Sequence, residues 1–444
     1  HLREVDLLSD IRKSDASNIA EEELIGDSLL LTDVIPAQDQ TQFVDTCRTG
    51  LTCIEDYGDT TIQSIKTFYK ALDNVDNLGR PVRIAFFGDS FIEGDILTAD
   101  LREKLKAHFG GSGVGFVPIT SKTHGYRFTV RHLFDNWSSH GQTDTVYFDR
   151  SKQGIAGSYF VARNNAYVEL RGQSKFCENL DTCQVASIYF ASKSVVELEA
   201  SINKDPRKVY RSYGEQYLQQ VKVEGEIGSI RWIVRNAKDA LFYGVAMDGK
   251  KVISLDNFSI RGSSGLSLRG IPESALKEFT RLRPYDLIVL QYGLNVATPT
   301  GRNYDKYKQG MLTAIEHLKR SFPESAILLL SVGDRSHKTS NGDYRTMPGV
   351  KNLIKYQQSI AMESGVAFWN MYEAMGGEGS IVKMVQAKPS MANQDYTHIN
   401  FKGGSHIAGL LYETFIYGKE QYDRKPHPSP LRRERGQDLT DDKN

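Results

Sequence analysis

Residues 82–90, Val-Arg-Ile-Ala-Phe-Phe-Gly-Asp-Ser, decide the fold that the sequence predicts. The apolar run has the length of a buried strand and ends in the polar turn Gly88-Asp89-Ser90. An amphipathic helix is expected directly after it, because apolar residues recur at helical spacing between positions 96 and 105. A strand that leads into such a helix is the unit of mainly parallel α/β sheets, whose ligands bind at the carboxyl ends of the strands. Ser90 is therefore expected at the functional edge of a sheet.

The same alternation of strands and helices returns in the second half of the chain. Further buried strands are predicted at 252–260, 287–292, 326–331 and 366–369. Apolar residues at helical spacing predict helices around 311–318 and 407–415. This order favours a mainly parallel sheet with helices on both faces, which is a three-layer α/β/α fold.

The segment between these two parts has a different texture, rich in Tyr, Val, Phe and turn residues at strand spacing. Its predicted strands are 145–148, 158–162, 166–170, 185–191 and 230–234. The pattern favours an inserted β-sandwich, similar to a jelly roll. Four aromatic side chains of the insert either stack on sugar rings or form its core, and these are Trp137, Tyr147, Tyr159 and Trp232.

Changes in composition and in the spacing of apolar residues divide the chain into four regions. The predicted regions are an N-terminal extension at 1–79, a discontinuous α/β domain at 80–125 and 252–418, the β-sandwich insert at 126–251, and a polar tail at 419–444. The insert is interpreted as a possible carbohydrate-binding domain. The tail is rich in Pro, Arg and Asp and nearly free of apolar residues, which predicts disorder.

Composition excludes several classes of function. The 444 residues carry 55 Lys and Arg against 55 Asp and Glu, so a formal net charge of +0 offers no attraction to nucleic acid. No apolar run approaches the roughly 20 residues that cross a bilayer, so no transmembrane segment is expected. The chain begins at His1, so a signal peptide or lipid anchor before it cannot be read.

The four cysteines fall into two close pairs. Cys47 precedes Cys53 and Cys177 precedes Cys183, each pair within a polar, turn-rich stretch. This spacing predicts two small disulfide loops, which favours an oxidising compartment. The alternative is four unrelated buried thiols. Neither a Cys-x-x-Cys motif nor a zinc-ligand spacing occurs, so no metal is expected.

The tripeptide Gly-Asp-Ser occurs twice, and only one copy has the context of a nucleophile. Ser28 follows a run of glutamates with no strand before it, whereas Ser90 follows a buried strand. A serine hydroxyl is a weak nucleophile at neutral pH and needs a base that accepts its proton. Ser90 is therefore the candidate nucleophile.

A base and its orienting carboxylate are predicted late in the chain. His398 follows Asp395 by three residues, just ahead of the last helix, so one loop could bring both side chains to the sheet edge. Read alone, an Asp-x-x-His pair is more often a surface pair. Acyl transfer also needs hydrogen-bond donors for a developing oxyanion. The candidates are the Ser90 backbone N–H, a glycine N–H at Gly262 or Gly265, and the Asn295 amide.

Together these segments resemble the four sequence blocks of the SGNH hydrolases, also called GDSL esterases. The blocks are Gly88-Asp89-Ser90, Gly262 within Arg-Gly-Ser-Ser-Gly, Gly293-Leu-Asn295 and Asp395-Tyr-Thr-His398. The resemblance implies a flavodoxin-like catalytic domain. Its implied catalytic residues are Ser90 as nucleophile, His398 as base and Asp395 as its orienter, with Ser90, Gly262 and Asn295 as the oxyanion hole and Asp89 and Gly293 lining the site. Val296 departs from the family, where an acidic residue usually follows the asparagine.

A narrower resemblance links residues 88–118 to bacterial peptidoglycan O-acetylesterases. It rests on Gly-Asp-Ser-Phe-Ile-Glu-Gly-Asp at 88–95, on Leu101-Arg102 and on Phe-Gly-Gly-Ser-Gly-Val-Gly-Phe-Val-Pro at 109–118. It implies a secreted or periplasmic serine esterase of the cell envelope that removes acetyl groups from a polysaccharide. No cofactor is implied, and the expected partner is an acetylated carbohydrate.

Three alternatives stay open at this stage. Asp334 and His337 follow a predicted strand and could replace the triad pair or line the site. The chain could instead be a glycan-binding protein with a relic hydrolase fold. It could also be an esterase or lipase for other acyl esters, although no Gly-x-Ser-x-Gly motif surrounds Ser90.

Overall fold

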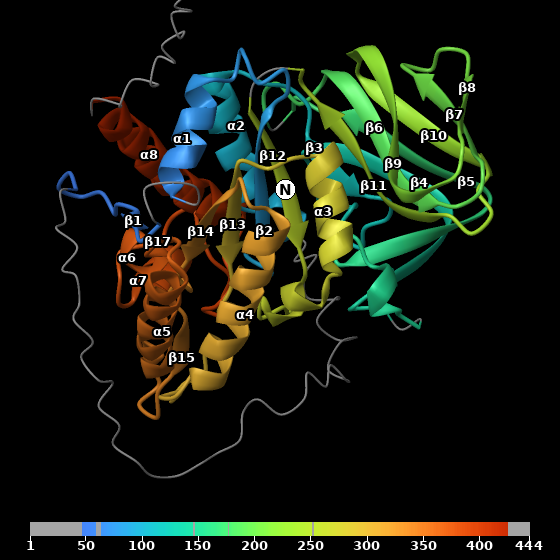
Figure 1. Ribbon diagram of the computed structural model, residues 1–444. Helices are drawn as coiled ribbons and strands as arrows, with labels where there is room; N and C mark the ends of the chain where they lie inside the picture. Colours follow the sequence, from blue (N-terminus) through green and yellow to red (C-terminus); the bar gives the residue numbers. More distant parts are fainter. Residues whose placement is uncertain (1–46, 59–63, 145–146, 176, 251–252, 425–444) are drawn as a thin grey trace, which may run out of the picture.

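The structure is a computed structural model that describes residues 47–58, 64–144, 147–175, 177–250 and 253–424 (Figure 1). Most of the predicted extension, with Ser28, lies outside the described residues, as does the tail beyond 424. Helix α8, Phe401–Arg424, continues past the predicted start of that tail at 419.

A six-stranded sheet forms the centre of the α/β part. Its strands are β1 Glu55–Asp56, β2 Val82–Gly88, β12 Ile253–Ser259, β13 Leu287–Gln291, β14 Ala326–Leu330 and β17 Ala367–Trp369. They lie in the order β1-β17-β14-β13-β2-β12. All neighbours are parallel except β1, which pairs antiparallel with β17 at the edge. Without β1 the order of the strands is 2-1-3-4-5, which is the flavodoxin-like arrangement.

Helices cover both faces of this sheet because each strand alternates its apolar side chains between two cores. In β2, Ile84 and Phe86 belong to one buried cluster and Ala85 and Phe87 to the other. The first cluster contains α1 Ile65–Asp73, α2 Thr98–Phe109 and α8, and the second contains α3 Glu273–Leu282, α4 Asp305–Ser321 and α5 Pro348–Ser364 (Figure 1). Burying each large side chain contributes about 1.5–3 kcal/mol. The predicted three-layer α/β arrangement is confirmed.

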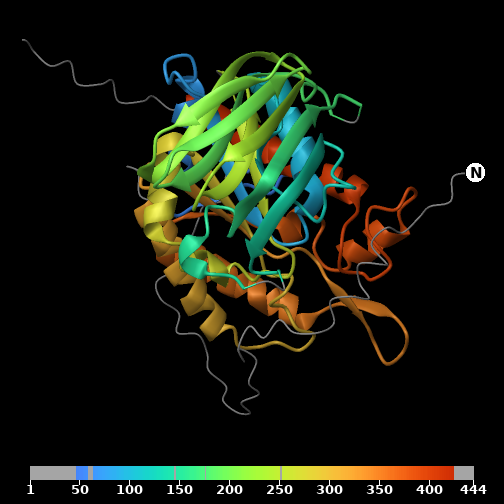
Figure 2. The same cartoon turned by 90° about the vertical axis from the view of Figure 1, so that its right-hand side faces the viewer.

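The insert forms an antiparallel sheet of nine strands beside the α/β part (Figure 2). The strands are β3 Gly115–Pro118, β4 Val130–Gly141, β5 Ser158–Gly172, β6 Cys183–Ser192, β7 Val196–Ile202, β8 Lys208–Ser212, β9 Glu215–Ile227, β10 Ser229–Asn236 and β11 Leu241–Asp248. Their order is β8-β7-β10-β5-β11-β6-β9, with β3 on β11 and β4 on β5. Because all nine strands join one hydrogen-bonded network, the division into a two-sheet sandwich stays a prediction.

Several details of the insert differ from expectation. The two strands predicted at 158–162 and 166–170 are one continuous strand, β5. At 145–148, the first two residues lie outside the described residues and the other two are not in a strand. β3 pairs with β11 although it precedes the predicted boundary at 126. The hydrogen-bonding partner of a short apolar strand is not visible in its own sequence.

A buried ion network joins the two sheets. Arg283 is fully buried, and its Nη1 donates to Asp248 of β11 at 2.5 Å while its Nε donates to Asp256 of β12 at 2.6 Å. Buried charges of this kind are tolerated only when they are paired and hydrogen-bonded. The guanidinium therefore holds the C-terminal end of β11 against β12, the strand next to β2.

Only one of the two predicted disulfides is present. Cys47 and Cys53 are bonded, with their Cα atoms 5.8 Å apart. The predicted Cys177–Cys183 bond is wrong, because both residues are free thiols. Cys183 points into the core of the antiparallel sheet, whereas Cys177 packs with Ala99 of α2, so the two side chains belong to different apolar clusters. Burial raises the pKa of both thiols to about 12, which keeps them protonated and inert.

The four aromatic residues that could stack on sugar rings lie in different environments. Trp232 and Tyr159 are 1% and 4% exposed and belong to the core. Trp137 is partly buried, and its indole N–H donates to the carbonyl of Tyr167 at 2.8 Å. Of these four residues, only Tyr147 is largely exposed, so the structure favours the core interpretation for Trp232 and Tyr159. Across the described ranges, no helix has both the length and the apolar composition that a membrane span requires.

Candidate active site

Three loops meet at the carboxyl edge of the parallel sheet. Gly88 at the end of β2 lies in register with Ser259 of β12 on one side and with Gln291 of β13 on the other. The three following loops therefore begin at the same level. The next two parallel strands in the sequence, β12 and β13, lie on opposite sides of β2, so the strand order reverses there. Such a switch point is where open α/β sheets form their binding crevices.

Ser90, His398 and Asp395 form a hydrogen-bonded triad at this edge. His398 Nε2 lies 3.1 Å from Ser90 Oγ, and His398 Nδ1 lies 2.8 Å from Asp395 Oδ2. An ionised carboxylate only accepts hydrogen bonds, so Nδ1 carries the proton and Nε2 presents its lone pair to the serine hydroxyl. The predicted nucleophile, base and orienting carboxylate are brought together across 308 residues of sequence.

A tight turn, and not a helix, presents the acid and the base together. Asp395 Oδ1 accepts the backbone N–H groups of Thr397 and His398, each at 3.0 Å. Tyr396, between Asp395 and Thr397, has a φ of +53°, an uncommon conformation for a residue with a side chain. The carbonyl of His398 accepts the N–H of Asn393 at 2.8 Å and closes the turn. The turn thus fixes the carboxylate against the imidazole before any substrate arrives.

The charge of Asp395 is well defined. Burial raises the pKa of its carboxyl, but hydrogen bonds from the His398 ring and the two backbone N–H groups outweigh this, and the pKa falls to about 2. Asp395 is therefore ionised at neutral pH and can stabilise the imidazolium that forms when His398 accepts a proton. The side chain of His398 is 36% exposed and Ser90 is 7% exposed, so the nucleophile is recessed beneath an accessible base.

Asp89 supports the nucleophile loop. Its carboxylate is fully buried and accepts the N–H of Phe91 at 3.0 Å, while Oδ2 lies 3.5 Å from Asn295 Nδ2. Burial raises the pKa of Asp89 to about 7, against hydrogen bonds that lower it. Asp89 therefore connects the loop after β2 with the loop after β13.

The structure distinguishes the two glycines considered for the oxyanion hole. Gly265 has its N–H bonded to Ser263 Oγ at 3.1 Å, and a Cβ there would lie 2.7 Å from the Tyr292 ring. At Gly262 a Cβ would meet nothing within 4 Å, and its φ of +79° favours glycine. Gly262 thus faces open space beside the loop, whereas Gly265 is a packing residue. This supports the predicted choice of Gly262.

Asn295 is held on the same edge by the loop after β12. Its Nδ2 donates to the carbonyl of Ser263 at 3.0 Å, one residue beyond Gly262. Gly293, two residues earlier, has a φ of +124°, and a Cβ there would lie 2.8 Å from Val332. The glycine lets the loop turn where a side chain has no room. Asn295 and Gly262 therefore come from adjacent, directly bonded loops.

Arg335 supplies support that the sequence analysis missed. Its Nη1 donates to the carbonyls of Leu294 at 2.9 Å and Ala297 at 3.1 Å, on both sides of Asn295. Val296 follows Asn295 in this chain, and the Arg335 guanidinium, which comes from a different loop, holds the backbone on both sides of the asparagine. Arg335 has no motif around it, so only the tertiary structure identifies this role.

Asp334 and His337 do not act as a second triad pair. Asp334 is buried and accepts Thr346 Oγ1 at 2.7 Å and the N–H of Ile381 at 2.9 Å, at the start of α7 Ser380–Gln386. Burial raises the pKa of its carboxyl. His337 lies in β15 Ser336–Lys338, paired with Arg345 of β16 Tyr344–Thr346. Asp334 therefore supports the start of α7, and the histidine that is hydrogen-bonded to Ser90 is His398.

Asn295→Ala is expected to lower kcat for a small acetyl ester by about 10²–10³-fold with a smaller change in KM, because an oxyanion donor acts mainly in the transition state. Initial rates over a range of ester concentrations measure this effect. Asn77→Ala, at an exposed asparagine far along the chain from the site, is the matched control and should retain the wild-type rate. An Asn295→Ala variant with unchanged kcat would remove this side chain from the oxyanion hole.

A solved structure of a peptidoglycan O-acetylesterase has the same architecture. The match has a TM-score of 0.66 with 18% sequence identity, and it covers 83% of this chain and 99% of that one. The chain therefore has the fold of that enzyme. The match covers 83% of the chain, whereas the residues outside 119–252 make up only about 70% of it. The shared fold therefore includes part of the antiparallel sheet. The predicted likeness to peptidoglycan O-acetylesterases is confirmed for the fold.

Other solved structures are more distant. A family two carbohydrate esterase from Cellvibrio japonicus has a TM-score of 0.28, with 8% identity over 66% of this chain and 98% of that chain. A carbohydrate esterase of family 3 from Talaromyces cellulolyticus has a TM-score of 0.27, with 15% identity over 37% of this chain and 72% of that one. These scores are too low to support an argument.

Comparisons of sequence alone give no relative. No protein-family model matches the chain, and no curated protein matches it. Within the described ranges, no group of three or more His, Cys, Asp or Glu side chains is arranged to hold a metal ion.

Proposed function

We propose that the chain is a serine esterase that removes O-acetyl groups from a polysaccharide through an acyl-enzyme intermediate. The observation that carries the proposal is the continuous hydrogen-bonded relay from Ser90 Oγ through His398 to Asp395. The relay lies at the switch point of the sheet, where the loops that carry Gly262 and Asn295 also begin.

The geometry supports a two-step reaction. His398 Nε2 accepts the hydroxyl proton of Ser90 as Oγ attacks the acetyl carbonyl carbon, and the negative charge moves to the carbonyl oxygen. The N–H groups of Ser90 and Gly262 and the Asn295 amide are the proposed donors to that oxygen. The carbon–oxygen bond to the sugar then breaks, and the sugar alkoxide leaves with the proton from His398. Water activated by His398 hydrolyses the acetyl-serine, which releases acetate.

Two observations support a small acyl group on a large carrier. The base is more than a third exposed, so a bulky alcohol can approach it from solvent. The solved structure that shares this fold is described as a peptidoglycan O-acetylesterase, which acts on such a substrate. Peptidoglycan, or another acetylated glycan, is therefore the proposed substrate class.

An extracytoplasmic location, secreted or periplasmic, is part of the proposal. The Cys47–Cys53 bond supports it, because small disulfide loops persist in oxidising compartments. The buried thiols of Cys177 and Cys183 are compatible with either environment, since burial protects them from oxidation.

Acetate release and acyl-chain preference test the proposed function together. We expect the wild-type protein to release acetate from at least one of O-acetylated peptidoglycan and acetylated xylan. With p-nitrophenyl esters, the proposed preference for a small acyl group predicts that kcat/KM falls from acetate to butyrate to octanoate. A rate that rises with chain length would favour a lipase. Glycan binding without any ester hydrolysis would favour a relic fold.

A further inference from the structure

The hairpin of β15 and β16 lies against the turn that carries the acid and the base. The two strands pair antiparallel with each other and with no other strand that the structure describes. Residues 340–343, at the tip of the hairpin, are exposed. A two-stranded hairpin is only marginally stable by itself in water, so contacts with the rest of the protein must hold it in place.

The base of the hairpin is anchored to its surroundings. The Thr346 hydroxyl donates to the buried carboxylate of Asp334 at 2.7 Å and accepts the N–H of Gly379 at 2.8 Å, just before α7. The N–H of Met347 donates to the carbonyl of Arg335 at 2.9 Å, which closes the base of the hairpin. Both strands of the hairpin are therefore fixed where they leave the body of the protein.

From this fixed base the hairpin contacts Tyr396, the residue of the catalytic turn whose φ is +53°. The N–H of Ser336 donates to the carbonyl of Tyr396 at 3.0 Å. The Tyr344 ring stacks on the Tyr396 ring, with the ring centroids 3.6 Å apart and the planes at 14°. The hairpin thus holds both the backbone and the side chain of Tyr396.

Tyr396 needs this support because a left-handed conformation is unfavourable for a residue with a side chain. The conformation lets the chain reverse, so that the Asp395 carboxylate meets both the backbone N–H and the ring Nδ1 of His398. Rotation of Tyr396 toward an ordinary negative φ would move Asp395 relative to His398 and break these bonds. The geometry of the triad therefore depends on what keeps Tyr396 in place.

We propose that Tyr344 is a positioning residue of the triad, whose ring keeps Tyr396 left-handed and thereby keeps Asp395 against His398. The inference rests on the proposed function, because it concerns the same nucleophile and base. Tyr344 acts through Tyr396 and not on the ester itself. Arg335, the residue before β15, holds the loop of Asn295, so one short segment supports both the acid–base turn and an oxyanion donor.

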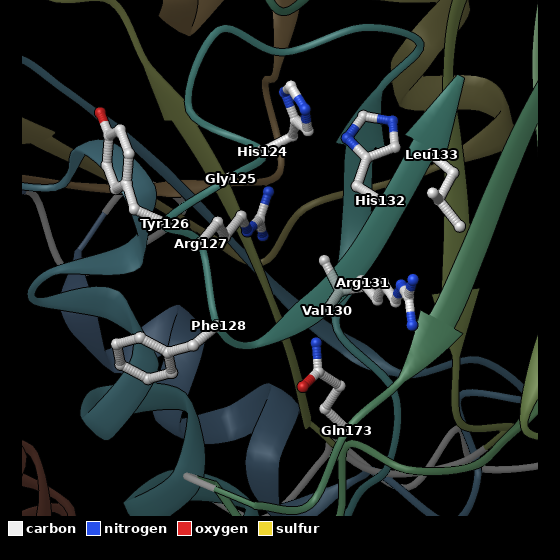
Figure 3. Close-up of a pocket in the computed structure, with 10 residues that line it drawn as sticks. All are labelled: His124, Gly125, Tyr126, Arg127, Phe128, Val130, Arg131, His132, Leu133 and Gln173. Carbon is white, nitrogen blue, oxygen red and sulfur yellow. The ribbon is translucent and has the colours of Figure 1, made fainter. Parts of the chain in front are cut away.

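Removal of the Tyr344 ring tests this role. Tyr344→Ala should lower kcat for p-nitrophenyl acetate about 3–10-fold with little change in KM, because the lost contact holds the turn and not the substrate. Tyr344→Phe keeps the stack and should restore the wild-type rate. His124→Ala is the matched control, because it removes a ring that lies edge-on to Phe134 at 5.0 Å, beside a pocket next to β4 (Figure 3). This variant should retain the wild-type rate.

A double-mutant cycle separates positioning from a general loss of stability. Glycine at position 396 adopts a positive φ without strain and offers no ring for Tyr344 to stack on. In the Tyr396→Gly background, Tyr344→Ala should therefore lower kcat by less than about twofold. A purely structural effect of Tyr344→Ala would be equally large in both backgrounds.

The Nδ1 proton of His398 gives a readout that needs no turnover. In protein with isotope-labelled histidine, we expect a low-field proton resonance from the Nδ1–H bond to Asp395, absent in His398→Ala, weakened in Tyr344→Ala and retained in Tyr344→Phe. The inference is overturned if Tyr344→Ala keeps the wild-type kcat and resonance, if it changes KM alone, or if its loss is equal in both backgrounds. A resonance that depends on the Tyr344 ring, in a wild-type protein that hydrolyses no ester, would support the inference and contradict the proposed function.

Discussion

Ser90→Ala should lower kcat for p-nitrophenyl acetate by about 10⁴–10⁶-fold, because the Ser90 hydroxyl is the group hydrogen-bonded to His398 and the triad acts as a unit. The substitution removes one oxygen from a side chain that is 7% exposed. The thermal unfolding curve should therefore stay close to that of the wild-type protein. The rate is measured as the release of p-nitrophenol, in a continuous or a stopped assay.

Ser151→Ala provides the matched control, because Ser151 is an exposed serine of the insert. It should hydrolyse the ester at the wild-type rate. If Ser90→Ala retained more than a small percentage of that rate while folded, Ser90 would not be the nucleophile.

Asp395→Asn is expected to lower kcat by about 10²–10⁴-fold with the fold retained. An amide at this position presents either an N–H or an oxygen to His398, and an N–H facing Nδ1 would favour the tautomer whose Nε2 carries the proton. His398 could then no longer accept the proton of Ser90. Rates at saturating ester concentration measure the loss, and Asp343→Asn in the exposed turn between β15 and β16 is the control.

The pH dependence of stability gives a second readout for Asp395. The pKa of its carboxyl is about 2 in the folded chain, against an ordinary value of 3.8. The folded state therefore binds this proton less readily than the unfolded state, and the ionised form stabilises the fold above about pH 4. The stability difference between wild type and Asp395→Asn should shrink as the pH falls from about 4 toward 2. A difference that grew over this range, or a fully active Asp395→Asn variant, would contradict the assignment.

The parallel sheet could be predicted from the sequence because its strands are buried on both faces. Val82–Gly88 and Ala326–Leu330 match their predicted runs within a residue, since such strands are continuous apolar segments. β1, Glu55–Asp56, was not predicted, because it is two residues long and joins the sheet edge through its backbone. The pairing of β3 with the insert was missed for the related reason that strand partners depend on the whole fold.

The site was predictable where its chemistry is local in sequence. Asp395 and His398 are three residues apart, and Ser90 follows its strand directly, so a short sequence motif identifies the acid–base pair and another identifies the nucleophile. Arg335 acts on carbonyls about 40 positions earlier in the chain, and no local pattern reports such a contact. The wrong Cys177–Cys183 bond has a similar cause. Spacing reports separation along the chain and not the direction in which each side chain points.

Labelling with a fluorophosphonate tests the central claim, that Ser90 and His398 form a working nucleophile and base. Such a reagent reacts covalently with a serine oxygen only when a neighbouring base activates it. We expect one adduct, located by peptide mass spectrometry on Ser90, with loss of esterase activity in proportion to labelling and no adduct in His398→Ala. An unlabelled Ser90 in an active preparation, or an adduct on another serine that accounts for the lost activity, would contradict the account.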